Sequence, residues 1–293
     1  MLVLGSGGLL GGNVSGVARA QGHEVIGTYH STEPALDGPI HQLDIRDTDR
    51  VRELVDTHDP DVVVNCAAMT DVDGCETDVK AARATNATAP GDIAAVCAER
   101  GTDVVHISTD YVFDGTATEP YAERDTTGPV QTYGVTKLAG ERAVRDSHPD
   151  PLVARLSFVY GVDRSTGELS GFPAWVHDRL RRGERTPLFV DQQMTPSRAG
   201  ATAETLLEAV EGEVTGLFHV ASRSCVTPYE FGVQLCEQTG RATSLVEESS
   251  RAAVDRLADR PAYTCLDVSE IEARLGRPQP TLSEDLKAIA NVL

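Results

Sequence analysis

A tyrosine and a lysine stand four residues apart in the segment "QTYGVTKLAGE", which runs from Gln131 to Glu141. Residues four apart in a helix share one face, so the ammonium group of Lys137 can lie near the hydroxyl group of Tyr133. Tyrosine, with an ordinary pKa of about 10, is a poor acid or base at neutral pH. A nearby positive charge lowers that pKa, and the pair could then exchange a proton with a substrate oxygen. The chain has only three lysines, and we interpret Tyr133 and Lys137 as a catalytic pair.

A hydroxyl group at the end of a predicted strand could act on the same oxygen. The strand "DVVHIS" ends at Ser108, and Thr109 follows it, upstream of Tyr133. A hydrogen-bond donor at this place could polarise a carbonyl group while Tyr133 supplies the proton. Thr109 is therefore the third catalytic candidate.

A glycine-rich turn lies directly after the first predicted strand. In "LGSGGLLGG", Gly5, Gly8 and Gly11 follow a Gly-x-x-Gly-x-x-Gly spacing and open the first predicted helix. Glycine permits a tight turn and a close approach of the backbone to a ligand, and a helix N-terminus supplies N–H donors and a positive dipole end. At the start of an α/β series, this arrangement predicts that the turn binds the pyrophosphate of a dinucleotide.

The end of the second predicted strand bears on the choice of cofactor. An acidic residue there normally binds the ribose diol of NAD, but this strand ends with Thr28, Tyr29, His30 and Ser31, and Glu33 lies too far along. The missing acid favours NADPH, because nothing repels a 2′-phosphate. Since no arginine lies nearby in the sequence to bind that phosphate, use of NADH stays open.

The elements that would position these residues alternate between strand and helix. The predicted strands cover residues 1–4, 23–29, 61–65, 103–108 and 151–160, and the predicted helices cover residues 9–22, 47–59, 87–101 and 133–146. Nearly all-apolar strands are typical of parallel strands covered by helices on both faces. The pattern predicts an α/β fold with a doubly wound parallel Rossmann sheet.

Beyond Gly161 the pattern changes. Residues 161–171 resemble a loop, and two later helices should begin with capping boxes, at Thr227 with Glu230 and at Thr281 with Glu284. We therefore predict an NAD(P)-binding Rossmann domain over residues 1–160. Residues 161–293 should form a smaller C-terminal α/β region that is mainly substrate-binding, with some of its strands rejoining the large sheet.

Composition limits the partners. The 293-residue chain has 45 acidic and 26 basic residues, a net charge of −19, which disfavours nucleic acid and anionic membranes as partners. An acidic chain with few lysines resembles proteins adapted to a salt-rich cytoplasm, where screening weakens self-repulsion. The chain has no long apolar run and no leader-like start, so we expect a cytoplasmic protein. A homodimer is one candidate assembly.

Cysteine and histidine give no metal site. The six cysteines form no Cys-x-x-Cys motif, and the eight histidines are scattered, so we predict no metal ligands. In a cytoplasmic chain the cysteines are expected to be small buried apolar residues or inert thiols. No Gly-x-Ser-x-Gly elbow supports a hydrolase.

Five segments together resemble one known family. "GSGGLLGG", "LDIRD", "NCAAMTDVD", "ISTDYVFDG" and "YGVTKLAGE" are similar to motifs of the extended short-chain dehydrogenases/reductases, and within them to the dTDP-4-dehydrorhamnose reductases. The resemblance implies roles by position. The residues implied to bind the cofactor are Gly5, Gly8, Leu9, Leu10, Gly11, Asp44, Ile45, Ala67, Ala68, Met69, Thr70, Tyr133 and Lys137. Those implied to border the substrate are Thr109, Asp110, Tyr111 and Phe158.

The resemblance also implies a reaction. Members of that group reduce the 4-keto group of a nucleotide-linked deoxysugar, with hydride from the nicotinamide and a proton from the tyrosine. A tryptophan contacts the sugar in the family pattern Arg-x-Ser-Trp-Val-Tyr, whereas Phe158 stands at that place here. Losing the indole N–H removes a donor, which leaves the identity of the sugar open.

Two alternatives remain on the same framework. One is an epimerase or dehydratase of nucleotide sugars, although a dehydratase needs an acidic pair and Asp110 is followed by Tyr111. The other is a non-catalytic NADP-binding subunit like the regulatory subunit of methionine adenosyltransferase. Net consumption of NADPH by the substrate separates a reductase from enzymes that recycle their cofactor. Co-purification with a synthetase and no turnover on any keto sugar would favour the binding subunit.

Overall fold

The computed structural model describes residues 1–293 and contains a large lobe built on one parallel sheet. The seven strands, in spatial order, are β12 (Gly216–His219), β6 (Leu152–Leu156), β5 (Asp103–Thr109), β4 (Val62–Asn65), β1 (Leu2–Leu4), β2 (Ile26–Tyr29) and β3 (Ile40–Gln42). Strands β1, β4 and β6 are buried along their whole length, because helices cover both faces. The predicted doubly wound α/β fold is confirmed.

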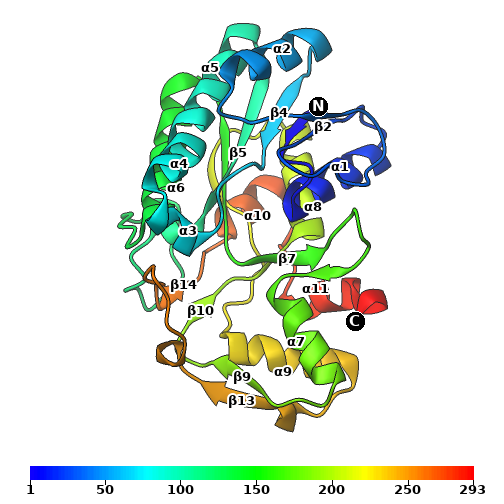
Figure 1. Ribbon diagram of the computed structural model, residues 1–293, viewed down its shortest axis with the longest axis vertical. Coiled ribbons are helices and arrows are strands. Elements are labelled where there is room, and N and C mark those ends of the chain that lie inside the picture. Colours follow the sequence, from blue (N-terminus) through cyan, green and yellow to red (C-terminus); the bar gives the residue numbers. More distant parts are fainter.

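Helices form a layer on each face of this sheet (Figure 1). One layer contains α2 (Thr48–His58), α5 (Ala89–Arg100) and α6 (Thr132–Ser147), and the other contains α1 (Leu9–Ala20) and α8 (Ala199–Glu211). Each layer encloses its own cluster of buried apolar side chains against the sheet. Three short helices precede α5: α3 (Val72–Thr77), α4 (Val79–Arg83) and the π-helix η1 (Ala84–Thr88).

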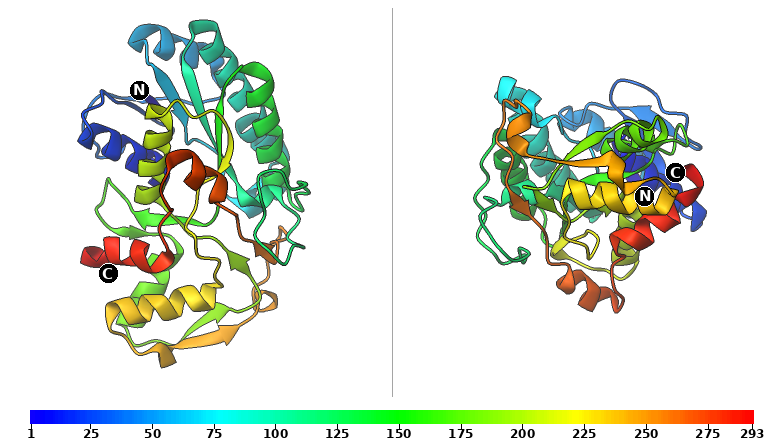
Figure 2. Two further views of the ribbon diagram at one scale, coloured as in Figure 1. Left: turned by 180° about the vertical axis from the view of Figure 1, so that it is seen from behind. Right: turned by 90° about the horizontal axis from the view of Figure 1, so that it is seen from below.

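A smaller lobe lies at one end of the sheet lobe (Figures 1 and 2). Its strands are β7 (Val159–Val162), β8 (Leu169–Ser170), β9 (Thr186–Phe189), β10 (Gln193–Met194), β11 (Ser197–Arg198), β13 (Val246–Ser249) and β14 (Tyr263–Thr264). Its helices are α7 (Phe172–Arg181), α9 (Pro228–Thr239) and α11 (Leu282–Ala288), and α10 (Ser269–Leu275) follows β14. A third apolar cluster, drawn only from residues beyond 159, packs inside it.

Some predicted elements differ from those observed. The single strand predicted over residues 151–160 is two strands, β6 and β7, because the chain turns at Ser157 and Phe158, where Phe158 has φ +45°. Strand β7 leaves the large sheet and pairs with β8 and β11, so part of the predicted loop at 161–171 is a hairpin. Strand β3 was not predicted.

Other predicted features agree with the structure. Thr227 with Glu230 and Thr281 with Glu284 form capping boxes at the starts of α9 and α11. Gly101 ends α5 in the left-handed conformation. Helix α8 and strand β12 come from beyond residue 160 yet pack in the large lobe. No helix is long and apolar enough to cross a membrane.

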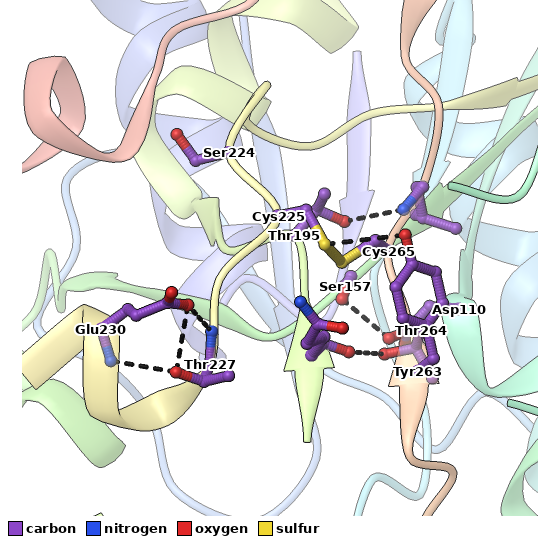
Figure 3. The surroundings of a disulfide bond; sticks show 12 residues. Asp110, Ser157, Thr195, Ser224, Cys225, Thr227, Glu230, Tyr263, Thr264 and Cys265 are labelled. Carbon is purple, nitrogen blue, oxygen red and sulfur yellow. Dashed lines mark hydrogen bonds between the residues drawn. A yellow bond between two sulfur atoms is a disulfide. The ribbon is translucent and has the colours of Figure 1, made fainter. Parts of the chain in front are cut away.

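The cysteine prediction was wrong for one pair. Cys225, in the segment before α9, and Cys265, directly after β14, form a disulfide (Figure 3). The two residues are 40 positions apart in the sequence and meet only because β10 pairs with β14 and Met194 bridges to Val226. The other four cysteines are free thiols, and three of them are buried.

Closing a loop of this length should contribute measurable stability. In the chain-entropy model the constraint on the unfolded state contributes about 4 kcal/mol at 25 °C. We expect the Cys225→Ser/Cys265→Ser variant to lose up to that amount in its free energy of unfolding. Denaturant titration at fixed salt, with and without a dithiol reductant, measures it. The double variant should not respond to reductant, and identical midpoints for oxidised and fully reduced wild type would contradict the expectation.

Candidate active site

A cleft of about 660 Å³ crosses the carboxyl ends of β1, β4 and β5. In open α/β sheets this edge is where ligands bind. Most residues predicted for the site line it together, namely Gly5, Gly8, Leu9, Leu10, Gly11, Ala67, Ala68, Thr70, Thr109, Asp110, Tyr111, Tyr133, Lys137 and Phe158. They meet because Leu4, Asn65 and His106 pair in register, so the residues after them lie side by side.

Three predicted cofactor residues do not line the cleft. The Ile45 side chain is buried in the core between α2 and the sheet. Asp44 faces His30 and Arg46 near the surface. Met69 is held through its backbone, since its N–H donates to the Asn86 amide oxygen (2.8 Å) and its carbonyl accepts from the Asn86 amide nitrogen (2.9 Å).

The glycine turn has the shape that a diphosphate requires. Gly5 has φ +82°, and a Cβ on Gly11 would lie 2.2 Å from the Gly5 carbonyl oxygen, so α1 starts directly against the turn. Gly8 caps α1 without any side-chain bond, and the first-turn amides of Leu9 and Leu10 have no hydrogen-bond partner in the chain. Free amides at a helix N-terminus that face a cleft fit an anionic diphosphate group.

The end of β2 has more charge nearby than the sequence indicated. Tyr29, His30, Ser31 and Thr32 line the cleft. The His30 ring lies 3.7 Å from the Asp44 carboxylate, which Arg46 binds with two nitrogens. The Arg46 side chain lowers the pKa of Asp44 to about 2. Arg46 thus comes within one carboxylate of His30, but it binds Asp44 and does not line the cleft.

An acid at position 30 should reverse the preference between the two nicotinamide cofactors. We expect His30→Asp to weaken NADPH binding by about 10-fold or more, because the new carboxylate repels a 2′-phosphate and can accept from a ribose diol, while NADH binding improves. Fluorescence titration with each cofactor measures both affinities. His23→Asp, on the far surface, is the matched control. An unchanged ratio of affinities would show that residue 30 does not face the ribose.

The N-terminal half of α6 contributes both members of the predicted catalytic pair, Tyr133 and Lys137, to the cleft. The Gln131 side chain caps the helix by accepting from the Gly134 N–H (2.8 Å). Lys137 is 2 % exposed, and its ammonium group donates to the Ile107 carbonyl of β5 (2.6 Å). Burial lowers the pKa of Lys137 to about 8, while the negative charge of Glu141 opposes that shift.

The pKa of Tyr133 differs from the expectation that Lys137 lowers it. Burial raises the pKa of Tyr133 well above its ordinary value, and the charge of Asp110 raises it further, whereas a hydrogen bond with Thr109 acts in the opposite direction. The ammonium of Lys137 is bonded to Ile107 and is not among the causes of this shift. Tyr133 therefore holds its proton, which suits a proton donor.

Thr109 and Asp110 form the floor of the cleft beside the tyrosine. The Thr109 hydroxyl donates to the Asp110 carboxylate (3.0 Å). The other carboxylate oxygen of Asp110 accepts from Ser157 (2.7 Å; Figure 3). Burial raises the pKa of Asp110 to about 6 despite these bonds. Asp110 thus accepts from two hydroxyl groups, and its charge acts on the pKa of the neighbouring Tyr133.

Phe158 lies at the sharp turn between β6 and β7. Its φ of +45° is rare for a residue with a bulky side chain, and such strain persists only where the surroundings enforce it. The ring packs edge-to-face against Phe172 (5.3 Å between centroids) and Phe231 (6.1 Å) while it lines the cleft. The position that holds tryptophan in the family pattern thus presents an aromatic wall here.

The structure adds cleft residues that sequence reasoning did not name. The C-terminal part of the chain contributes Gln192, Met194 and Thr264, and no local pattern marks them. Asn86 lies behind the cleft in the π-helix η1 and holds Met69 in place. In the sequence Asn86 stands between Thr85 and Ala87 in "ATNATAP", and no local pattern marks it as buried or as part of a π-helix.

The fold and the Tyr-x-x-x-Lys site beside a glycine turn define an extended short-chain dehydrogenase/reductase. A model of one family within that class, described as the RmlD substrate binding domain, matches residues 1–293, and the chain belongs to this family.

Curated relatives and solved structures agree with this assignment. A Haloferax volcanii protein named "Probable low-salt glycan biosynthesis reductase Agl14" is 55% identical over 98% of this chain and 96% of its own length. A dTDP-4-dehydrorhamnose reductase of Mycolicibacterium smegmatis is 36% identical over 94% of this chain and 80% of its own. The crystal structure of a dTDP-4-dehydrorhamnose reductase from Clostridium acetobutylicum superimposes with a TM-score of 0.86 at 29% identity, covering 99% of this chain and 98% of that one.

Proposed function

We propose that the protein is an NADPH-dependent reductase of a keto group on a nucleotide-linked sugar. The observation that carries this proposal is that free amides at the start of α1 and the proton-holding Tyr133 face one cleft. Relatives that share at least a third of their residues with the chain are named as reductases, several of them for dTDP-linked keto sugars.

We propose a separate role in the reduction for each of the main cleft residues. Reduced nicotinamide, when bound, supplies the hydride. Tyr133 donates its proton to the oxygen that becomes negative, and Thr109, next to it, can donate a hydrogen bond to the same oxygen once released from Asp110. Lys137, whose ammonium group donates to the Ile107 carbonyl, is proposed to bind the cofactor ribose. The proposed cofactor is NADPH, with NADH as the weaker substitute.

The finer proposal concerns the sugar. We propose a 4-keto-6-deoxyhexose linked to dTDP, such as dTDP-4-dehydrorhamnose, because relatives 36% and 34% identical to the chain are named dTDP-4-dehydrorhamnose reductase. The smaller lobe, with Phe158, Met194 and Thr264 on the cleft, is proposed to bind the sugar. A dehydratase is disfavoured because that reaction needs an acidic pair, and Asp110 is followed by Tyr111.

Three broader proposals accompany this one. The net charge of −19 and the scarcity of lysine support adaptation to a salt-rich interior. The substrate and cofactor support a cytoplasmic location. A homodimer is the proposed assembly.

Purified protein incubated with NADPH and a panel of nucleotide-linked 4-keto sugars tests the function. We expect loss of reduced-nicotinamide absorbance in proportion to added sugar for at least one dTDP-linked member. Parallel reactions with UDP- and GDP-linked sugars test the base. Tight NADPH binding without turnover on any member would favour a regulatory subunit instead.

A further inference from the structure

Three consecutive residues of β5 lie against three consecutive turns of α6. The Ile107 carbonyl accepts from Lys137 (2.6 Å), the Ser108 hydroxyl donates to Glu141 (2.5 Å), and the Thr109 hydroxyl lies close enough to Tyr133 to oppose the rise in its pKa. The helix residues are four apart and therefore share one face. Glu141 is thus the third member of a row that contains both groups of the catalytic pair, although it does not reach the cleft.

The carboxylate of Glu141 is buried and fully engaged. One oxygen accepts from Ser108 and from the Arg155 guanidinium (2.9 Å), and the other accepts from Arg155 (2.8 Å). Both side chains are at most 4 % exposed. Arg155 lies opposite Ser108 in the register of β5 and β6, so one carboxylate connects α6 to two strands.

The buried ion pair between Glu141 and Arg155 is not expected to add much to the stability of the fold. Desolvating two charges costs free energy that packed apolar side chains would not, and one guanidinium nitrogen of Arg155 remains without a partner. We therefore look for a role of this ion pair in the neighbouring cleft. Lys137 lies one turn before Glu141 on the same face of α6. In the proposed function it must keep both its position and its positive charge.

We propose that Glu141 is a positioning residue of the proposed reductase, which holds α6 in register with β5 and keeps Lys137 protonated. The inference rests on the proposed function. The groups whose charges interact with Lys137 or with this carboxylate are Cys66 at the end of β4, His106 on β5, Arg155 on β6 and Glu141 on α6. Desolvation raises the pKa of the Cys66 thiol and lowers that of His106, which favours their neutral forms, so Glu141 supplies the negative charge.

The sign of the effect follows from these charges. Lys137 already has a pKa of about 8, and loss of the carboxylate removes the main influence that raises it. Without Glu141 the lysine should lose its proton at a lower pH. NADPH binding and turnover should then decline at a lower pH as the solution is made alkaline.

Glu141→Gln is the direct test. We expect the alkaline limb of NADPH affinity, measured by fluorescence titration from pH 6 to pH 10 at fixed salt, to move down by about one unit. The limb of kcat/KM should move with it, while affinity at pH 6 stays within a few-fold. Asp285→Asn is the matched control, because Asp285 is equally buried and bonded to Arg198 (2.7 Å) but remote from Lys137.

Glu141→Gln leaves the buried charge of Arg155 unpaired and could unfold the protein. A second variant keeps the inference testable in that case. Glu141→Gln/Arg155→Met removes both charges and should fold; we expect a smaller shift in the same direction. An unmoved limb in folded variants would overturn the inference, as would an equal shift in Asp285→Asn. The pH dependence of NADPH affinity tests the role of Glu141 even if no keto sugar is reduced. Failure of this inference can therefore be told apart from failure of the proposed function.

Discussion

Tyr133→Phe is expected to reduce turnover by about 10²–10⁴-fold and to leave NADPH affinity within a few-fold. The substitution removes only the hydroxyl group, while the ring keeps its edge-to-face contact with Tyr111 (6.2 Å between centroids). Phenylalanine has no acidic proton, so the variant loses the proposed donor while the shape of the ring is kept.

Steady-state kinetics together with cofactor titration check this prediction. Tyr111→Phe is a useful companion, since it removes a neighbouring hydroxyl on the same cleft and should cost far less in kcat. Turnover of Tyr133→Phe close to that of the wild type would reject Tyr133 as the acid. A parallel loss of NADPH binding would instead show that the ring had moved.

Gly11→Ala is expected to abolish measurable NADPH binding, an affinity loss of about 100-fold or more. Its Cβ would lie 2.2 Å from the Gly5 carbonyl oxygen and 2.7 Å from the carbonyl carbon, so the start of α1 must move away from the turn. Overpacking of this kind also costs about 1–3 kcal/mol of stability. The free amides at the helix start would then no longer face the diphosphate.

Gly16→Ala provides the control within the same helix. A Cβ there would meet only the flexible Arg164 side chain, at 3.4 Å, and alanine has the better helix propensity. This variant should bind NADPH like the wild type and be equally stable or up to about 1 kcal/mol more stable. Thermal unfolding and cofactor titration of both variants decide the matter. If Gly11→Ala bound NADPH like the wild type, the glycine turn could not be part of the cofactor site.

The local parts of the site could be predicted from sequence because local rules specify them. The glycine turn follows a strand and opens a helix, and the spacing of Tyr133 and Lys137 needs only helical periodicity. Capping boxes were equally readable at Thr227 and Thr281. In each case the residues that decide the geometry are within a few positions of one another.

The remaining features depend on contacts between distant segments. Thr264 reaches the cleft, and Cys225 meets Cys265, through pairings of strands and bridges that no local pattern encodes. The turn at Phe158 requires a positive φ, which cannot be predicted from an aromatic residue type. The raised pKa of Tyr133 depends on how deeply the folded chain buries the ring, so reasoning from the nearby lysine alone gave the wrong direction.

The central claim is that this cleft transfers a hydride to a sugar carbonyl group that Tyr133 protonates. The most direct measurement uses NADPH deuterated at the transferable position of the nicotinamide ring, incubated with the protein and a dTDP-linked 4-keto-6-deoxyhexose. We predict one deuterium on carbon 4 of the product, by mass spectrometry and NMR, and an equal amount of oxidised cofactor. A sugar that is epimerised or dehydrated without deuterium, while NADPH stays reduced, would contradict the account.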